Sequence, residues 1–230
     1  MKKILKNFIN NFFLLISSNR FVMKYLLIID SYLYKIISRS SVKINSGKHP
    51  KHFIINYQNW FTNNIKEKSN VIDIGCSHGH LTSHIASKAK NVLGIEINKK
   101  DLELAKTINS KNNISYLNAD ATEIDYSIYN KYEYIVLSNV LEHIQDRTKF
   151  LSNLLNSFQN GINVLIRVPS IERDWLAVYK KNNLIDYRLD STHYIEYTKV
   201  QLFNELHDAG LKIISCEMNF GEFYVVSKKE

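Results

Sequence analysis

The sequence predicts an α/β fold with a mainly parallel sheet, and two patterns carry this prediction. From residue 70 onward, short apolar runs alternate with stretches whose apolar residues recur at helical spacing. Such alternation is typical of parallel strands joined by crossover helices on both faces of a sheet. Only a few residues around Phe220 and Gly221 join the last two apolar runs, which predicts an antiparallel hairpin at the end of the chain.

The predicted elements occupy most of the chain after residue 50. Seven strands are predicted, at residues 70–75, 91–97, 114–118, 133–138, 162–168, 211–217 and 222–227. Helices are predicted at residues 53–65, 79–89, 99–109, 146–159 and 199–209. We therefore divide the chain into a basic, apolar helical extension at 1–48 and one α/β domain at 49–230, which is long enough to bury a sizeable core.

The first strand leads into the most informative stretch, VIDIGCSHGH at residues 71–80. Three apolar residues surround Asp73, and the chain then turns through Gly75 and Gly79 into a helical pattern. Glycine permits a sharp turn and lets a ligand lie against bare backbone. The start of the following helix offers free N–H groups to an anionic group.

A second acid, Glu96, ends the next apolar run. An acid at the end of the second strand is where nucleotide-binding α/β folds hold ribose hydroxyls. The spacing of the glycine turn is D-x-G-x-x-x-G and differs from the dinucleotide fingerprint G-x-G-x-x-G, because Ser77 occupies the middle glycine position.

The string D-I-G-C-S-H-G resembles the first motif of class I S-adenosylmethionine (SAM)-dependent methyltransferases, commonly written D-I-G-C-G-x-G. The resemblance covers about residues 50–228 and implies a Rossmann-like fold, SAM as cofactor and methyl transfer as the reaction. It implies that SAM is bound by Asp73, Gly75, Cys76, Ser77, Gly79, Glu96, Asp120, Ala121 and Asn139. Among these, Glu96 would hold the ribose and Asp120 would lie near the adenine.

Two histidines are candidates for the chemistry. The string N-V-L-E-H at residues 139–143 resembles the V-L-E-H of small-molecule O-methyltransferases that act on quinone precursors, and His143 is either a site histidine or a structural one. The long insertion at 168–198 is rich in aromatic residues and is predicted to form a lid or binding loop. Its LDSTHYIEYT piece resembles a substrate-facing segment of such enzymes, which makes His193 the first choice as general base, oriented by Asp190. A hydrogen-bonded structural role for His193 is the alternative.

A metal site is not predicted. His78, His80 and His84 have suggestive spacing, but nothing in the sequence supplies a matched fourth ligand. Cys76 and Cys216 form neither a disulfide framework nor a metal motif, which is typical of a reducing cytoplasm.

The positive charge of the chain lies at its N-terminal end. Residues 1–70 carry a net charge of +10, whereas the remaining residues carry −2. This distribution argues against a nucleic-acid surface on the domain. Residues 1–45 are too interrupted by polar groups for a transmembrane helix. They form either a pair of amphipathic helices on the inner face of a membrane or helices that cover the domain or pair with another copy.

The function that we infer from the sequence is methyl transfer from SAM to a hydroxyl of a sugar, glycan or lipid-linked precursor in the cytoplasm. A quinone or fatty-acid-like acceptor is the nearest variant. A non-catalytic SAM-fold scaffold subunit is one alternative. An NAD-dependent sugar-modifying enzyme is another, which the missing G-x-G-x-x-G and Tyr-x-x-x-Lys motifs disfavour.

Overall fold

The computed structural model describes residues 7, 11, 14, 19–47 and 49–230. The predictions for the remaining N-terminal residues lie outside this part of the chain. Two compact units are present: one comprises Met1–Ile54 with Asp174–Tyr187, and the other comprises Ile55–Arg173 with Arg188–Glu230. Part of the insertion after the fifth strand thus belongs with the N-terminal segment, whereas the sequence had assigned it to the α/β domain.

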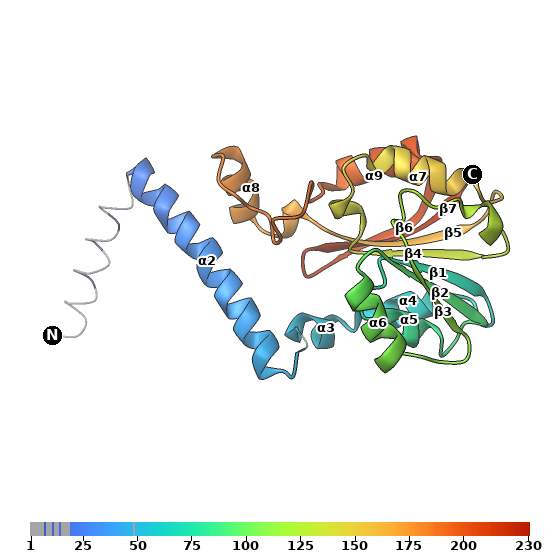
Figure 1. Cartoon of the computed structure of the whole chain (residues 1–230). Coiled ribbons are helices and arrows are strands. Elements are labelled where there is room, and N and C mark those ends of the chain that lie inside the picture. Colours follow the sequence, from blue (N-terminus) through green and yellow to red (C-terminus); the bar gives the residue numbers. More distant parts are fainter. Residues whose placement is uncertain (1–6, 8–10, 12–13, 15–18, 48) are drawn as a thin grey trace. The chain divides into compact units, whose positions relative to one another are not determined.

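The larger unit is built on a seven-stranded sheet (Figure 1). Its strands are β1 (Asn70–Ile74), β2 (Asn91–Glu96), β3 (Ile114–Asn118), β4 (Tyr134–Ser138), β5 (Asn163–Pro169), β6 (Leu211–Asn219) and β7 (Glu222–Lys229). They lie in the order β3-β2-β1-β4-β5-β7-β6, and β7 runs antiparallel to both of its neighbours. The Rossmann-like sheet and the C-terminal hairpin predicted from the sequence are therefore confirmed.

Helices cover both faces of this sheet. On one face lie α4 (Tyr57–Asn63), α5 (His80–Ile85) and α6 (Lys99–Ile108), and on the other lie α7 (Arg147–Asn156) and α9 (Lys199–Asp208) (Figure 1). Strand residues alternate between the faces. In β1, for example, Val71 packs with the α4 and α5 side, while Ile72 and Ile74 pack with the α7 and α9 side.

The helix predicted at 53–65 is wrong in its continuity. It is two helices, α3 (Pro50–Ile55) and α4, which are separated by Asn56. Asn56 has a φ of 50°, in the left-handed region that breaks a right-handed helix, and asparagine enters this region more easily than most residues. Short 3-10 helices follow several strands: η1 (Tyr126–Tyr129), η2 (Leu141–His143) and η3 (Ile171–Arg173).

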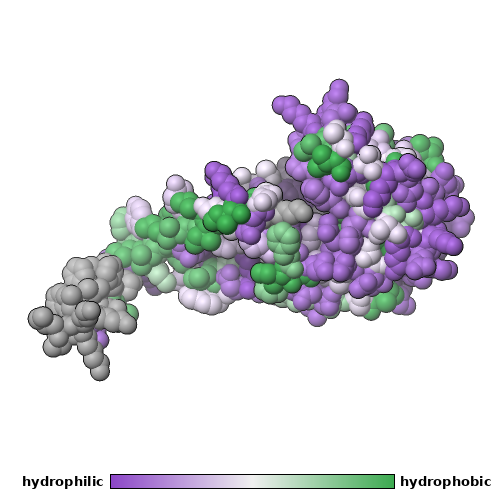
Figure 2. Space-filling view, turned by 90° about the horizontal axis from the view of Figure 1, so that it is seen from below, coloured by the Kyte–Doolittle hydropathy of each residue, from purple (hydrophilic) through white to green (hydrophobic). Residues whose placement is uncertain are grey.

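The smaller unit contains the long helix α2 (Arg20–Ile44) and the short helix α8 (Trp175–Asn182). Lys180 of α8 donates to the Asp30 carboxylate of α2 at 2.7 Å. Leu27 is the buried residue of α2, whereas Phe21, Tyr32 and Ile37 are each about two-thirds exposed. Figure 2 shows hydrophobic residues gathered on the surface of this unit. Within the described residues, no helix combines the length and the apolar character that a membrane span requires.

Candidate active site

The glycine turn after β1 is held by backbone hydrogen bonds. The N–H groups of Gly75 and Cys76 both donate to the carbonyl of Ile95 in β2, at 2.8 and 3.0 Å. Gly75 has a φ of 71°, and a Cβ at this position would come within 2.5 Å of Val140. Glycine is therefore required here both by the backbone conformation and by the close approach of the loop after β4.

Glu96 connects the end of β2 to this turn. Its carboxylate accepts hydrogen bonds from the backbone N–H of Ser77 at 2.9 Å and of Asn98 at 2.8 Å. Ser77 has a φ of 47°, so the serine that replaces the motif's middle glycine adopts a backbone conformation that favours glycine. Glu96 thus fixes the turn and still presents its carboxylate to the pocket.

Asp73 lies beneath the turn instead of on the pocket wall. It alternates with Ile72 and Ile74, so its side chain points to the α5 side of the sheet, where it accepts from the Thr82 hydroxyl at 2.6 Å. Burial raises the pKa of Asp73 to about 7, although the hydrogen bond from Thr82 lowers it. Asp73 therefore ties β1 to α5 and does not line the cavity.

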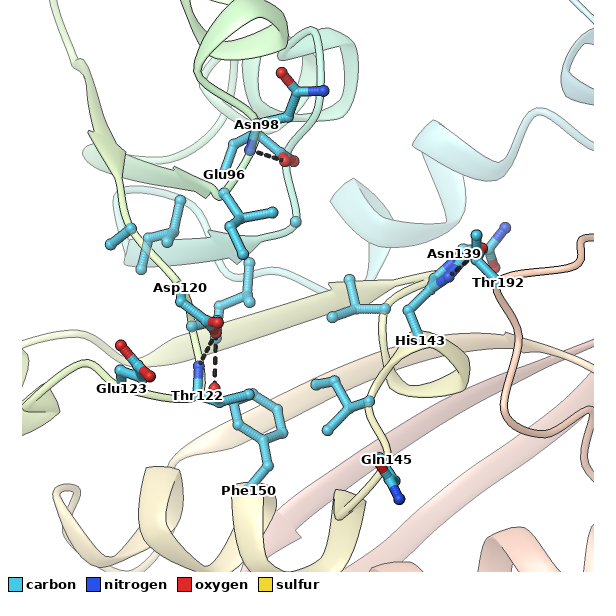
Figure 3. A pocket seen from close by; sticks show the side chains of 18 of the residues that line it. Glu96, Asn98, Asp120, Thr122, Glu123, Asn139, His143, Gln145, Phe150 and Thr192 are labelled. Atoms are coloured by element: carbon cyan, nitrogen blue, oxygen red, sulfur yellow. Dashed lines mark hydrogen bonds between the residues drawn. The ribbon is translucent and has the colours of Figure 1, made fainter.

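A cavity of about 1230 Å³ opens at the carboxyl edge of the sheet, above β1, β2 and β4. The sequence-predicted residues on its wall are Gly75, Ser77, Glu96, Asp120, Ala121, Asn139 and His143. Those not on its wall are Asp73, Cys76, Gly79 and His193. Figure 3 shows that Glu96 and Asp120 lie apart from His143 and Thr192, so the pocket has two differently built sides; Asn139 lies close to His143, where the two sides meet.

Two further predicted residues present free oxygen acceptors to the cavity. One oxygen of Asp120, Oδ1, accepts from the N–H and the hydroxyl of Thr122, at 2.9 and 2.7 Å. Asn139 has a φ of 58°, and its buried Oδ1 has no hydrogen-bond partner among the described residues. A buried acceptor without a partner at the pocket wall is a place where a ligand can donate a hydrogen bond.

His143 faces the pocket and is oriented from behind. Its Nδ1 lies 3.0 Å from the Thr192 hydroxyl, which lies 2.8 Å from Asp190 Oδ1. The hydrogen bonds from Thr192 lower the pKa of Asp190, so this carboxylate is an acceptor and the hydroxyl donates to it. The Thr192 oxygen then accepts from Nδ1–H of His143, which leaves the Nε2 lone pair of His143 free.

His193 is buried next to His143, with the two rings edge to face at 4.7 Å. Its Nδ1 lies 3.2 Å from Oε1 of Glu196, which is fully buried and forms an ion pair with Arg173. Glu196 is therefore the partner that orients His193. The sequence had suggested Asp190 for this role, but Asp190 is connected to His143 through the Thr192 hydroxyl. Nδ1–H of His193 donates to the Glu196 carboxylate.

Glu142 completes this group, and sequence reasoning did not select it. The side chain is fully buried, and neither carboxylate oxygen has a hydrogen-bond partner among the described residues. Burial raises the pKa of Glu142 to about 8. The backbone N–H of Glu142 itself and, more weakly, Arg167 lower this pKa, and Arg167 does so without donating a hydrogen bond. Burial and the neighbouring His193 lower the pKa of His143, so His143 is neutral at neutral pH.

The methyltransferase domain family matches residues 51–216 of this chain. The chain belongs to this family. A SAM-dependent methyltransferase of Aquifex aeolicus is similar in structure, with a TM-score of 0.60 and 16% identity over 82% of this chain and 97% of that one. The magnesium protoporphyrin IX methyltransferase of Synechocystis, solved with bound S-adenosylhomocysteine (SAH), has a TM-score of 0.59 and 16% identity over 78% of this chain and 83% of that one. SAM is accordingly the cofactor of this methyltransferase domain.

The curated relatives of this methyltransferase are named ubiquinone biosynthesis O-methyltransferases. The one from Rickettsia canadensis is 23% identical over 71% of this chain and 70% of its own length. The one from Nitrosomonas europaea is 27% identical over 51% of this chain and 52% of its own length. This chain spans less than two-thirds of the length of most of these curated relatives.

The wall of the pocket fits SAM chemically. SAM carries hydrogen-bond donors on its ribose, its adenine amino group and its ammonium group. The cavity offers acceptors in the Glu96 carboxylate, the second oxygen of Asp120 and the unpartnered Oδ1 of Asn139. Gly75 lines the cavity, so bare backbone of the turn lies where a ligand can pack against it.

Proposed function

We propose that this methyltransferase transfers the methyl group of SAM to a hydroxyl oxygen of a small molecule. The observation that carries the proposal is one cavity that holds acceptors suited to SAM on one side and a histidine facing the same space on the other. The volume of about 1230 Å³ suits a cofactor together with an acceptor.

On the donor side, each predicted residue receives a role. Glu96 would bind the ribose hydroxyls, Asp120 the adenine amino group, and Asn139 a donor of the amino-acid portion. Gly75, Ser77 and Ala121 would line the cofactor with backbone. Asp73, Cys76 and Gly79 would shape the turn from beneath, since they lie off the cavity wall.

On the acceptor side, His143 and His193 would activate the hydroxyl. SAM supplies a reactive methyl group, so the chain needs only to align the acceptor oxygen with it and to make that oxygen a better nucleophile. His143 lines the cavity, its Nδ1 is engaged with Thr192, and burial lowers its pKa. His193 lies off the wall, so its contribution passes through the contact with His143. His143 is therefore the better placed of the two predicted bases.

For the acceptor, a phenolic hydroxyl of a lipid-linked quinone precursor has the best support. The relatives' name points to ubiquinone biosynthesis, and the V-L-E-H string agrees with it. A hydroxyl of a sugar or glycan, the first expectation from the sequence, remains a second candidate. SAH release measured with a catechol bearing a prenyl chain and with a polyprenyl-linked sugar distinguishes the two, since activity should appear with only one.

Contact with an anionic membrane surface is proposed for the N-terminal unit. Helix α2 exposes Phe21, Ile29 and Ile37, and it carries five basic residues, namely Arg20, Lys24, Lys35, Arg39 and Lys43. Its one acid, Asp30, is paired with Lys180. Apolar exposure combined with excess positive charge is typical of helices that lie on anionic lipid.

Vesicle flotation tests this contact. The chain should float with vesicles that contain phosphatidylglycerol and not with pure phosphatidylcholine vesicles. The double variant Lys35→Glu/Arg39→Glu should lose binding, while Lys131→Glu/Lys228→Glu, which makes the same charge change on exposed residues of the α/β unit, should keep it. A concentration-dependent dimer without flotation would instead support pairing of the helix with a second copy.

Calorimetry with SAM and with NAD tests the function itself. SAM should bind and NAD should not. Glu96→Gln should weaken SAM binding by about 1.5–3 kcal/mol, because a charge-assisted hydrogen bond is lost. Glu103→Gln removes an exposed acid on α6 and should leave the affinity unchanged. SAM binding without turnover on any hydroxyl acceptor would favour the scaffold alternative, and NAD binding without SAM binding would overturn the proposal.

A further inference from the structure

Two separate segments of the chain form the acceptor side of the cavity. Residues 144–146, which directly follow η2, line it, and so do Asp190, Thr192 and Tyr194 of the loop that returns to the sheet. His143 adjoins the first segment in the chain and contacts the second through Thr192. The separation of the two segments therefore sets the room that an acceptor has beside His143.

Arg147 holds the first of these segments. Its Nη1 donates to the carbonyls of Ile144 and Gln145, at 3.1 and 3.3 Å. The same guanidinium is bidentate to Glu205 of α9, since Nε donates to Oε2 at 2.9 Å and Nη2 donates to Oε1 at 2.8 Å. A planar guanidinium can make both sets of contacts at once, whereas the ammonium group of a lysine cannot.

Glu205 also accepts a hydrogen bond from the second segment. Tyr197 ends the returning loop and is fully buried, and its hydroxyl donates to Oε2 of Glu205 at 3.0 Å. Burial and the charge of Glu205 raise the pKa of Tyr197, so the hydroxyl keeps the proton that it donates. One carboxylate on α9 thus connects the residue that holds the first segment to the end of the second.

We propose that Glu205 is a positioning residue for the acceptor and that it sets the separation of the two segments through Arg147 and Tyr197. None of these three residues lines the cavity, so their effect passes through the segments that do. The backbone N–H of Tyr197 donates to Pro169 at the end of β5, at 3.0 Å. Glu205 therefore ties the segment after η2 to a point that is fixed on the sheet. The role for the acceptor rests on the proposed function, whereas the hydrogen-bonded link does not.

The burial of this ion pair makes the link sensitive to mutation. The side chains of Arg147 and Glu205 are 16% and 21% exposed, so water replaces a lost partner only in part. Breaking such a pair costs more than breaking one at the surface, because the remaining charge is left poorly solvated. Loss of the Glu205 charge should therefore draw Arg147 toward solvent and away from the carbonyls that it holds.

Hydrogen exchange of the full-length protein, followed by mass spectrometry, tests the link without any acceptor. In Glu205→Gln, which keeps the side-chain volume, exchange should become about 10- to 100-fold faster in peptides from 141–150 and 188–198 and stay unchanged in β2. Arg147→Lys keeps the charge but not the fork, and should show the faster exchange at 141–150. Tyr197→Phe should show it at 188–198, and both variants test the link if Glu205→Gln does not fold. The matched control Glu103→Gln, on α6, should exchange like the wild type.

Turnover tests the role for the acceptor, with whichever of the prenyl-chain catechol and the polyprenyl-linked sugar is active. Glu205→Gln and Arg147→Lys should raise the KM of that acceptor about 10-fold, because the walls that align it are displaced. The dissociation constant of SAM should stay within about twofold, since the donor side is untouched. A purely structural role would lower the unfolding free energy and leave this KM unchanged.

The outcomes separate this inference from the proposed function. Unchanged exchange in the folded variants, or equally faster exchange in β2, would overturn the link. Faster exchange confined to the two segments with an unchanged KM would overturn the positioning role. The same confined exchange, in a protein that binds SAM but methylates neither acceptor, would support the link and count against the proposed function alone.

Discussion

The two sides of the cavity are built in different ways. The donor side consists of one turn and the strand ends beside it, and backbone hydrogen bonds hold it together, as between Gly75 and Ile95. The acceptor side joins His143 to Thr192, which lies 49 residues further along the chain, through side-chain hydrogen bonds. The first side is part of the sheet, whereas the second is assembled by a loop that returns to it.

This difference means that the two sides should respond separately to mutation. Side chains on the acceptor side can be removed without disturbing the strands that form the SAM pocket. Changes in the turn after β1, in contrast, alter backbone that lines the donor side of the cavity. Ligand affinity and turnover should therefore separate between the two sides, and this separation can be tested.

The largest effect is expected for His143→Ala. Turnover should fall about 100-fold or more, because the group that activates the acceptor hydroxyl is lost. The dissociation constant of SAM should stay within about twofold, since surface changes away from a contact cost little. Release of SAH with whichever of the two acceptors is active measures turnover, and calorimetry measures the dissociation constant of SAM.

A pH profile adds a second readout for His143. Burial lowers the pKa of this histidine below its ordinary value of 6.5, so turnover should hold through neutral pH and decline only below that value as the ring takes a proton. The His143→Ala variant should lose this acidic limb. His84→Ala, in α5 and off the cavity wall, should keep both the rate and the profile. A large loss of SAM affinity in His143→Ala would show that the two sides are not separable.

On the donor side, Gly75→Ala should cost more stability than its conformation alone explains. Gly75 and Gly161 both have positive φ angles, but a Cβ at Gly161 meets nothing within 4 Å, while one at Gly75 comes within 2.5 Å of Val140. Gly161→Ala should cost about 1–2 kcal/mol of unfolding free energy. Gly75→Ala should add about 1–3 kcal/mol for overpacking.

Urea denaturation measures both alanine variants, and SAM calorimetry follows for those that fold. Gly75→Ala should also lose SAM affinity, because the turn must shift away from Val140. Equal destabilisation of the two variants would mean that Val140 moves freely, and that the donor side is less rigid than its backbone hydrogen bonds imply.

The same contrast explains what could be predicted from the sequence. The sheet, the turn and Glu96 follow from local patterns, since strands, glycines and the acid lie within a short stretch. Glu142 belongs to the N-V-L-E-H string that the sequence analysis selected. That its carboxylate is buried without a hydrogen-bond partner depends on how η2 packs, which the sequence does not show. Glu196 and Thr192 become orienting residues only through loop contacts that no periodicity encodes. The break at Asn56 was missed because the apolar pattern continues across this residue, whereas the helical backbone conformation is interrupted there.

The smallest effect is expected for Ser77→Gly, which restores glycine at the middle position of the turn. Ser77 has a φ of 47°, and no side-chain hydrogen bond of this residue is found in the described structure, so the exchange relieves strain without removing a contact. Unfolding free energy should rise by about 0.5–1 kcal/mol, less than the full left-handed penalty because glycine also gains freedom in the unfolded chain.

Lys68→Gly, at a φ of 60° outside the cavity, should give a similar gain in urea denaturation. SAM affinity should change only in Ser77→Gly, because the N–H of Ser77 is held by Glu96 at 2.9 Å, whereas Lys68 lies off the cavity wall. A loss of stability in Ser77→Gly alone would show that the serine side chain, and not the backbone bond to Glu96, holds the donor side together.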